Sequence, residues 1–401
     1  AIAPTNSNII YASISHKLNS TLVGLYRSTN GGTSWTLRAN SPDYLGSQGW
    51  YGNAVTVSPY NPDIVIVGGL DIYASFDGGV TLNQKTLWYT TNASNFSHAD
   101  IHFLGYNFNN GDLYCGSDGG VYRSSDDGTN WTDLNATLST LQYQSADYDV
   151  TNPLIIVGGT QDNNIERTSD GGASWTQYTT GDGGYTIFDP VSTNIVYSQY
   201  INGSVERSET GGVGFVEISP NGGSGGLFYN PYEMAPGNHN VIVFGQSDIW
   251  KTTTASTATQ SSGWSQISGP VGGNVSAIGI SATNVNKIYI GTDNGKILTT
   301  SNNGAVWTTP LSGLPYVSDI AVDPLNDATC YVTFGGFGPS LRVLKTTNSG
   351  ATWTNLSATM PIIPVNSIAL RTTLPRMLFL GTDLGVYRST DDGITWTSFN
   401  T

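Results

Sequence analysis

The eight residues Ser389-Thr390-Asp391-Asp392-Gly393-Ile394-Thr395-Trp396 contain the pattern that decides the fold. The pattern is Ser or Thr, any residue, Asp or Asn, any residue, Gly, two residues and then Trp. A short Asp or Asn side chain accepts hydrogen bonds from backbone amides of its own turn, and Gly takes a positive φ that a Cβ would obstruct. The Trp then enters the next strand and covers the apolar side of the hairpin. The stretch therefore predicts a tight turn that joins two antiparallel strands.

This turn pattern recurs along the whole chain. Clear copies end at Trp35, Trp131, Trp175, Trp307 and Trp353 as well as at Trp396, weaker copies run from Ser75 to Leu82 and from Ser208 to Phe215, and a degenerate copy lies between Lys251 and Trp264. The last residues of successive copies are between 40 residues (175 to 215) and 49 residues (82 to 131) apart. That spacing is the length of one four-stranded propeller blade.

The rest of each repeat reads as three more strands, separated by Pro- and Asn-rich turns. We therefore predict an all-β protein, a single β-propeller over residues 1–401 with about nine four-stranded blades; eight or ten blades are the alternatives. The approximate blades are 1–40, 41–86, 87–135, 136–180, 181–220, 221–268, 269–311, 312–358 and 359–401. The chain begins on an inner strand and ends on an outer one, so we expect packing between the first and last blades to close the ring. We expect any leader to have been removed or left out, and a neighbouring segment in the intact protein.

The recurring turns resemble those of the Asp-box, or bacterial neuraminidase repeat, propellers. That group includes sialidases, xyloglucanase-type glycoside hydrolases and the sortilin ectodomain. The resemblance covers essentially the whole chain and implies the propeller fold, but it implies no single function because hydrolases, lectins and receptors share the turn. Sialidase activity is disfavoured, because a sialidase pocket needs three arginines that bind a carboxylate. Most arginines of this chain instead occupy one repeated position just before a turn, and their repetition indicates a structural role. They are Arg27, Arg123, Arg167, Arg207 and Arg388, with Lys251 and Lys345 at the equivalent position.

Composition limits the partners of the chain. The formal net charge is −14 with only 15 Lys and Arg, so the chain would repel a nucleic acid backbone. No apolar run is long enough to insert into a membrane. Low lysine and high Ser, Thr and Asn content favour an extracellular or cell-surface location. Cys115 and Cys330 each fall in a predicted strand, and we expect two buried thiols rather than a disulfide.

Polar residues gather in four segments that we place on the face opposite the recurring turns. The stretch 98–102 is predicted to be a strand in which His98, Asp100 and His102 alternate onto one side. Turns at 116–120 and 158–164, the latter with Gln161 and Asp162, and a link at 181–184 are expected to converge beside it. These residues can form a pocket for a sugar, or they can satisfy backbone groups of long loops. No cofactor or metal is expected; two imidazoles and a carboxylate at 98–102 would be the candidate ligands.

Aromatic and acidic residues supply the remaining candidates. Trp50, Tyr51 and Trp88 lie outside any recurring turn and can form a platform that stacks on sugar rings, or can cap the first blades. A glycosidase needs a pair of carboxylates, and the candidates are Asp100, Asp118, Asp162 and Asp182. Three glutamates that flank the turns, Glu166, Glu206 and Glu209, are expected to be exposed.

Three functions stay open on these grounds. The first is a secreted or surface-displayed binding module for a glycan or another extracellular polymer or protein. The second is a polysaccharide-active glycoside hydrolase. The third is a structural subunit of a surface layer or filament, which would contact neighbouring domains or copies of itself.

Overall fold

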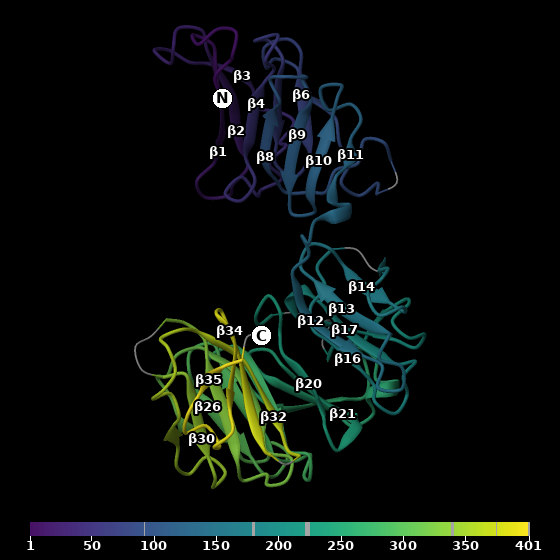
Figure 1. Ribbon diagram of the computed structural model, residues 1–401, viewed down its shortest axis with the longest axis vertical. Helices are drawn as coiled ribbons and strands as arrows, with labels where there is room; N and C mark the ends of the chain where they lie inside the picture. Colours follow the sequence, from purple (N-terminus) through teal and green to yellow (C-terminus); the bar gives the residue numbers. More distant parts are fainter. Residues whose placement is uncertain (92, 179–180, 221–224, 338–340, 374, 400–401) are drawn as a thin grey trace. The chain divides into compact units, whose positions relative to one another are not determined.

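A computed structural model describes residues 1–91, 93–178, 181–220, 225–337, 341–373 and 375–399 (Figure 1). The chain separates into two compact units, Ala1–Gln142 and Tyr143–Thr401. Each unit is described by itself. The helices described are single three-residue turns, and none has the length or apolar character that a membrane crossing requires.

The first unit contains three antiparallel sheets in chain order. The first sheet has strands β1 (Ile10–Ser15), β2 (Leu22–Ser28) and β3 (Thr36–Ala39). The second has β4 (Ala54–Val57), β5 (Val65–Gly68), β6 (Ile72–Ser75) and β7 (Asn83–Gln84). The third has β8 (Ile101–Tyr106), β9 (Leu113–Ser117), β10 (Gly120–Ser124) and β11 (Thr132–Asp133). In every sheet each strand pairs with the strand that follows it in sequence.

The described residues of the second unit form six four-stranded antiparallel sheets with the same connectivity. They are β12 (Tyr143–Tyr148), β13 (Ile156–Thr160), β14 (Ile165–Thr168) and β15 (Thr176–Gln177); β16 (Thr186–Phe188), β17 (Val196–Tyr200), β18 (Ser204–Ser208) and β19 (Val216–Glu217); β20 (Tyr232–Ala235), β21 (Asn238–Gly245), β22 (Ile249–Thr252) and β23 (Trp264–Ser268). The other three are β24 (Val275–Ile280), β25 (Ile288–Thr292), β26 (Ile297–Thr300) and β27 (Thr308–Leu311); β28 (Val317–Val322), β29 (Cys330–Phe334), β30 (Val343–Thr346) and β31 (Thr354–Asn355); and β32 (Val365–Arg371), β33 (Met377–Thr382), β34 (Gly385–Ser389) and β35 (Thr397–Ser398).

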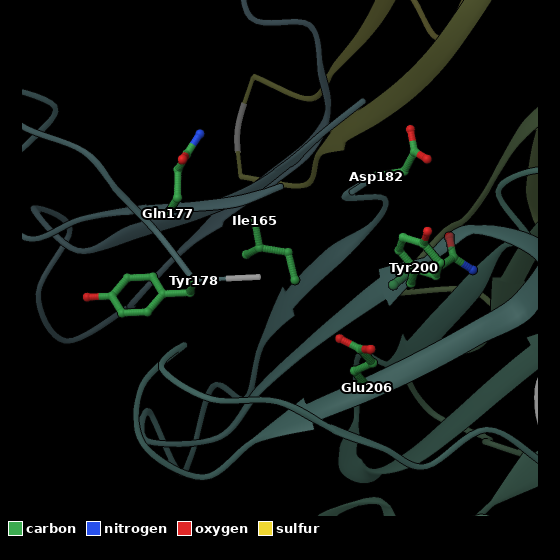
Figure 2. A pocket seen from close by; sticks show the side chains of 7 residues that line it. Ile165, Gln177, Tyr178, Asp182, Tyr200 and Glu206 are labelled. Carbon is green, nitrogen blue, oxygen red and sulfur yellow. The ribbon is translucent and has the colours of Figure 1, made fainter. Parts of the chain in front are cut away.

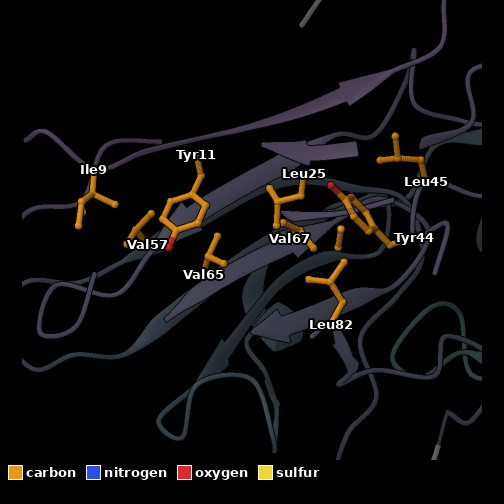
Figure 3. Packing of buried hydrophobic residues seen from close by; sticks show 11 residues of the cluster. Ile9, Tyr11, Leu25, Tyr44, Leu45, Val57, Val65, Val67 and Leu82 are labelled. Carbon is orange, nitrogen blue, oxygen red and sulfur yellow. The ribbon is translucent and has the colours of Figure 1, made fainter. Parts of the chain in front are cut away.

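The predicted all-β class is confirmed. In the part of the chain that the structure describes, nine antiparallel up-and-down sheets follow one another in sequence, as in a nine-bladed propeller. Apolar residues of the strands pack between successive sheets of a unit. Figure 3 shows one such core, in which Tyr11, Leu25, Val65 and Val67 lie between the first two sheets. The predicted burial of the two cysteine thiols is also confirmed, because Cys115 and Cys330 are both free and buried.

The recurring turns form the hydrogen bonds that the sequence predicts. In the last copy Asp391 Oδ1 accepts from the backbone amide of Thr395 at 2.9 Å, and Ser389 Oγ accepts from the amide of Gly393 at 2.8 Å. Gly393 has φ +89°, a conformation that a side chain would strain. The carboxylate of Asp391 also accepts from the Thr395 hydroxyl and from the Ser389 hydroxyl. The bond from the Thr395 hydroxyl, followed by those from the Thr395 amide and the Ser389 hydroxyl, lowers the pKa of Asp391 to about 2, since such bonds favour the charged carboxylate.

The tryptophans that end the turns differ in burial, and here the prediction was wrong in part. Trp131 and Trp396 are buried, whereas Trp35 is 44% exposed and Trp175 is 39% exposed. The indole Nε1 of Trp131 donates to Gly128 O of its own turn. Three others donate to the last part of the preceding sheet: Trp264 to Ile218 O at 2.7 Å, Trp307 to Ile267 O at 2.9 Å and Trp396 to Leu356 O at 2.9 Å. The same sequence position thus closes a turn in one copy and ties two sheets together in another.

In several copies, the repeated cation before the turn contacts the next sheet. Arg27 forms an ion pair with Asp63 of the next sheet at 2.5 Å, and Arg167 Nε donates to Gly211 O of the next turn at 2.8 Å. Lys251 Nζ donates to Val285 O at 2.7 Å in the same manner. These side chains bridge successive sheets within a unit.

Candidate functional sites

In the first unit, the predicted site residues form one connected cluster. The Tyr51 hydroxyl donates to Asp118 Oδ2 at 3.0 Å, and His102 Nε2 lies 2.6 Å from Asp118 Oδ1. The Tyr51 and His102 rings meet edge to face with centroids 4.6 Å apart. Gln48 Nε2 donates to Asp100 Oδ1 at 2.9 Å. A carboxylate oxygen of Asp100 lies within 4.8 Å of one of Asp118.

A tight hairpin turn brings Asp118 into this cluster. Ser117 at the end of β9 pairs with Gly120 at the start of β10, so Asp118 and Gly119 form a two-residue loop. A Cβ on Gly119 would lie 2.3 Å from His98 Cβ, so only glycine allows the turn to approach His98 this closely. The short loop therefore presents the Asp118 carboxylate at the strand end.

The predicted alternation of His98, Asp100 and His102 on one strand was wrong. Strand β8 begins only at Ile101, and Asp100 before it has φ +62°. The pairing of β8 with β9 also skips His102 in a β-bulge between Ile101 and Phe103. A bulge re-aims a side chain, and here it directs the imidazole of His102 to Asp118. In the described part of the first unit, His98, Asp100 and His102 do not gather three donor atoms within 4.8 Å of one another.

The predicted aromatic residues occupy two places. Trp50 is 76% exposed and its ring lies 5.3 Å from that of Tyr51, so it belongs to the cluster around Asp118. Trp88 lies beside Tyr89, with ring centroids 5.8 Å apart, and its backbone amide donates to the buried Asp71. Burial raises the pKa of Asp71.

In the second unit, the predicted residues Gln161, Asp162 and Asp182 join two loops. The backbone amide of Asp162 donates to Asp182 Oδ1 at 3.0 Å, and the side chain of Gln144 donates to Gln161 Oε1 at 3.3 Å. The amide of Asn164 also donates to Gly181 O at 2.8 Å. The turn after β13 is thus hydrogen-bonded to the link that leads into β16. The convergence of all four predicted segments on one face stays a prediction.

Asp182 also borders a hollow of about 630 Å³ in this unit (Figure 2). The lining side chains come from two successive sheets and the link between them: Ile165, Gln177, Tyr178, Asp182, Gln199, Tyr200 and Glu206. In the view of Figure 2, Tyr200 lies between the carboxylates of Asp182 and Glu206. The sequence analysis did not place Glu206 in a site.

The expectation that Glu166, Glu206 and Glu209 are all exposed was wrong for the first two. Glu166 is 3% exposed and Glu206 is half-buried, while Glu209 is exposed and pairs with Arg207. Burial raises the pKa of both buried glutamates; the Glu217 carboxylate adds to the effect on Glu206, and a hydrogen bond from Gln177 opposes it on Glu166. Strand alternation could have indicated this, since Glu166 directly precedes Arg167 and must point to the opposite side of β14.

A smaller hollow of about 80 Å³ lies among the first strands β20, β24 and β28. Glu233 and Asp319 line it, together with Tyr185 and hydroxyl groups of Ser276 and Ser318. The Glu233 side chain reaches solvent at the hollow, but the protein around its carboxyl group removes much of the water that would stabilise the charge. This desolvation raises the pKa of Glu233 to about 8, and the carboxylates of Asp319 and Asp147 add to the shift. The sequence pattern did not indicate a site at Glu233.

The sheets and turns define an all-β protein built of propeller-type blades. No family model matches the sequence, and a comparison with curated proteins found no match. Among solved structures, the chain is similar to the GH74 enzyme of Niastella koreensis, with 18% identity over 99% of this chain and 68% of that chain and a TM-score of 0.39. It is also similar to the GH74 xyloglucanase of Xanthomonas campestris (14% identity, 100% and 85% coverage, TM-score 0.31) and to YCF48 bound to D1 peptide (14%, 69% and 87%, TM-score 0.47). At these identities the likeness concerns the fold alone.

Proposed function

We propose that the chain is a binding module of the Asp-box propeller type that recognises a glycan through the cluster around Trp50 in its first unit. The observation that supports this most is the exposure of the Trp50 indole, 76%, beside polar groups that are already ordered. An aromatic face stacks on a sugar ring, and neighbouring carboxylate and amide groups bind its hydroxyls.

The ring beside Trp50 is held in place before any ligand arrives. Tyr51 contacts Trp50 on one side, and its hydroxyl donates to Asp118 while its ring meets His102. A platform that is ordered in advance loses less side-chain entropy when it binds. Asp100 and Gln48 add polar groups to the same cluster. We extend the proposal to an extracellular or cell-surface location, which rests on composition alone.

The test is a titration of the whole chain with a panel of neutral oligosaccharides, followed by calorimetry. Trp50→Ala should weaken binding of any ligand found by about tenfold or more, because stacking of one ring is worth about 1–3 kcal/mol. Phe108→Ala is the matched control, since Phe108 is 66% exposed in the same unit and outside the cluster. Equal effects of the two substitutions, or no binding across the panel, would contradict the proposal.

Hydrolysis of a glycan at the same cluster is the second candidate. It is favoured by the proximity of the Asp100 and Asp118 carboxylates, whose oxygens approach within 4.8 Å, since retaining glycosidases use carboxyl groups about 5 Å apart. Release of reducing ends from a bound oligosaccharide, lost in Asp100→Asn while binding is kept, would favour hydrolysis. Binding without any release would leave the module function alone.

A further inference from the structure

The charged side chains that line the hollow of about 630 Å³ in the second unit are acidic. Among the described residues that line it are two carboxylates, Asp182 and Glu206, and no Lys, Arg or His. A pocket with this lining attracts cations and repels anions, and the net charge of −14 reinforces the field.

The negative charge of the Glu206 carboxylate has no partner among the described side chains. In the part of the second unit that the structure describes, no hydrogen bond or ion pair reaches its side chain. It stands directly opposite Glu217 in the β18–β19 pair, and like charges at opposed positions destabilise a sheet. Partial burial adds a cost, because a charged group that leaves water needs a partner. A bound cation would supply that partner.

Gln199 provides an independent indication of a ligand. Its side chain is fully buried and lines the hollow, and its Nε2 donates to Asn230 O at 2.6 Å. The other amide atom, Oε1, has no hydrogen-bond partner among the described residues. Buried polar atoms are rarely left unpaired, and this one needs a hydrogen-bond donor. An ammonium or hydroxyl group is such a donor.

The surroundings fit an organic cation better than a metal ion. Among the described residues, no group of three His, Cys, Asp or Glu ligand atoms within 4.8 Å of one another includes Glu206. The volume lies in the range of pockets for small organic ligands. Tyr200 is 39% exposed and offers a ring face, and Gln177 and Tyr178 offer further polar groups for hydroxyls.

From these contacts we infer that the hollow binds an amino sugar, with the protonated amine at the Glu206 carboxylate and the sugar ring against Tyr200. A plain alkylammonium brings the cation but no hydroxyl groups for the polar side chains of Gln177 and Tyr178. A hexosamine brings both the cation and several hydroxyls. This site lies in the second unit and is independent of the proposed cluster at Trp50.

The experiment titrates the full chain at pH 7 with glucosamine, N-acetylglucosamine and glucose, and follows heat. Glucosamine should bind at least about tenfold more tightly than the other two sugars, because only its amine carries a charge and charge-assisted hydrogen bonds are the stronger ones. Glu206→Gln should weaken glucosamine binding by about tenfold. Glu209→Gln should not change it, since Glu209 is exposed and outside the hollow.

Several results would overturn the inference. These are no binding of glucosamine, equal binding of all three sugars, or a Glu206→Gln protein that binds glucosamine as the original does. Binding of Nα-acetyllysine amide as tight as that of glucosamine would overturn the assignment to an amino sugar. The Glu206→Gln protein is expected to fold, because the substitution keeps the shape and removes the repulsion with Glu217. A thermal melt of each variant separates loss of binding from loss of fold.

Discussion

Replacement of Trp396 by alanine should destabilise the second unit by more than the same replacement of Trp175. The indole of Trp396 is 6% exposed and packs in the core of the last two sheets, and its Nε1 donates to Leu356 O. Truncation of a buried tryptophan costs about 3–5 kcal/mol, to which a lost hydrogen bond contributes about 1 kcal/mol. Trp175 is 39% exposed, so it buries about two-thirds as much of its ring, and its loss should cost about 2 kcal/mol.

The assay is urea unfolding followed by far-UV circular dichroism. For each variant, the free energy of unfolding is taken from the transition that the substitution shifts. Both substitutions lie in the same unit and remove the same side chain, so the difference reports burial and the bond to Leu356. Trp396→Phe is a third variant, which should lose mainly the hydrogen bond, about 1 kcal/mol. Equal losses for the two alanine variants, or a greater loss at Trp175, would refute the reasoning.

Three further predictions concern the sites. Glu233→Gln should remove a pH dependence of stability. The pKa of Glu233 in the folded protein, about 8, exceeds its ordinary value of 4.5, so between these two pH values the native state binds one more proton than the unfolded state. The stability of the original protein relative to the variant should therefore fall as pH rises from 4.5 to 8, as measured by thermal melts across that range. Gly184→Ala should cost about 1–3 kcal/mol in urea unfolding, because the new Cβ would lie 2.7 Å from the Tyr229 ring and 2.9 Å from Gln199 Oε1; an unchanged midpoint would contradict it. Tyr51→Phe should weaken glycan binding about fivefold in calorimetry, with little change in melting temperature, because it loses only the bond to Asp118; unchanged binding would count against the ordered platform.

The fold could be predicted from the sequence because one local structure recurs. Ser389, Asp391 and Gly393 satisfy one another within eight residues, so no distant contact is needed to identify the turn. The burial of each Trp could not be predicted in this way. Trp35 and Trp396 occupy the same motif position, yet one is exposed and the other buried, because what covers the ring comes from elsewhere in the chain.

The residues of the cluster around Asp118 were predicted, but the geometry that joins them was not. Asp118 was found because a Gly-flanked Asp marks a tight hairpin loop. The role of His102 depends on a bulge, which shifts strand register and leaves no mark in the hydrophobic pattern. Glu206 was missed because its proximity to a recurring turn suggested exposure, whereas the hollow beside it exists only when two sheets are in contact.

Three sheets of the second unit each have a carbonyl that accepts a hydrogen bond from an indole of the following sheet, the donors being Trp264, Trp307 and Trp396. In each case a carbonyl at the outer edge of one sheet finds its donor only after the following sheet has formed. Removal of the last sheet should therefore leave Leu356 O exposed to solvent and loosen the outer edge of its predecessor. For these three sheets, the outer edge gains its full set of hydrogen bonds only when the next sheet in sequence is in place.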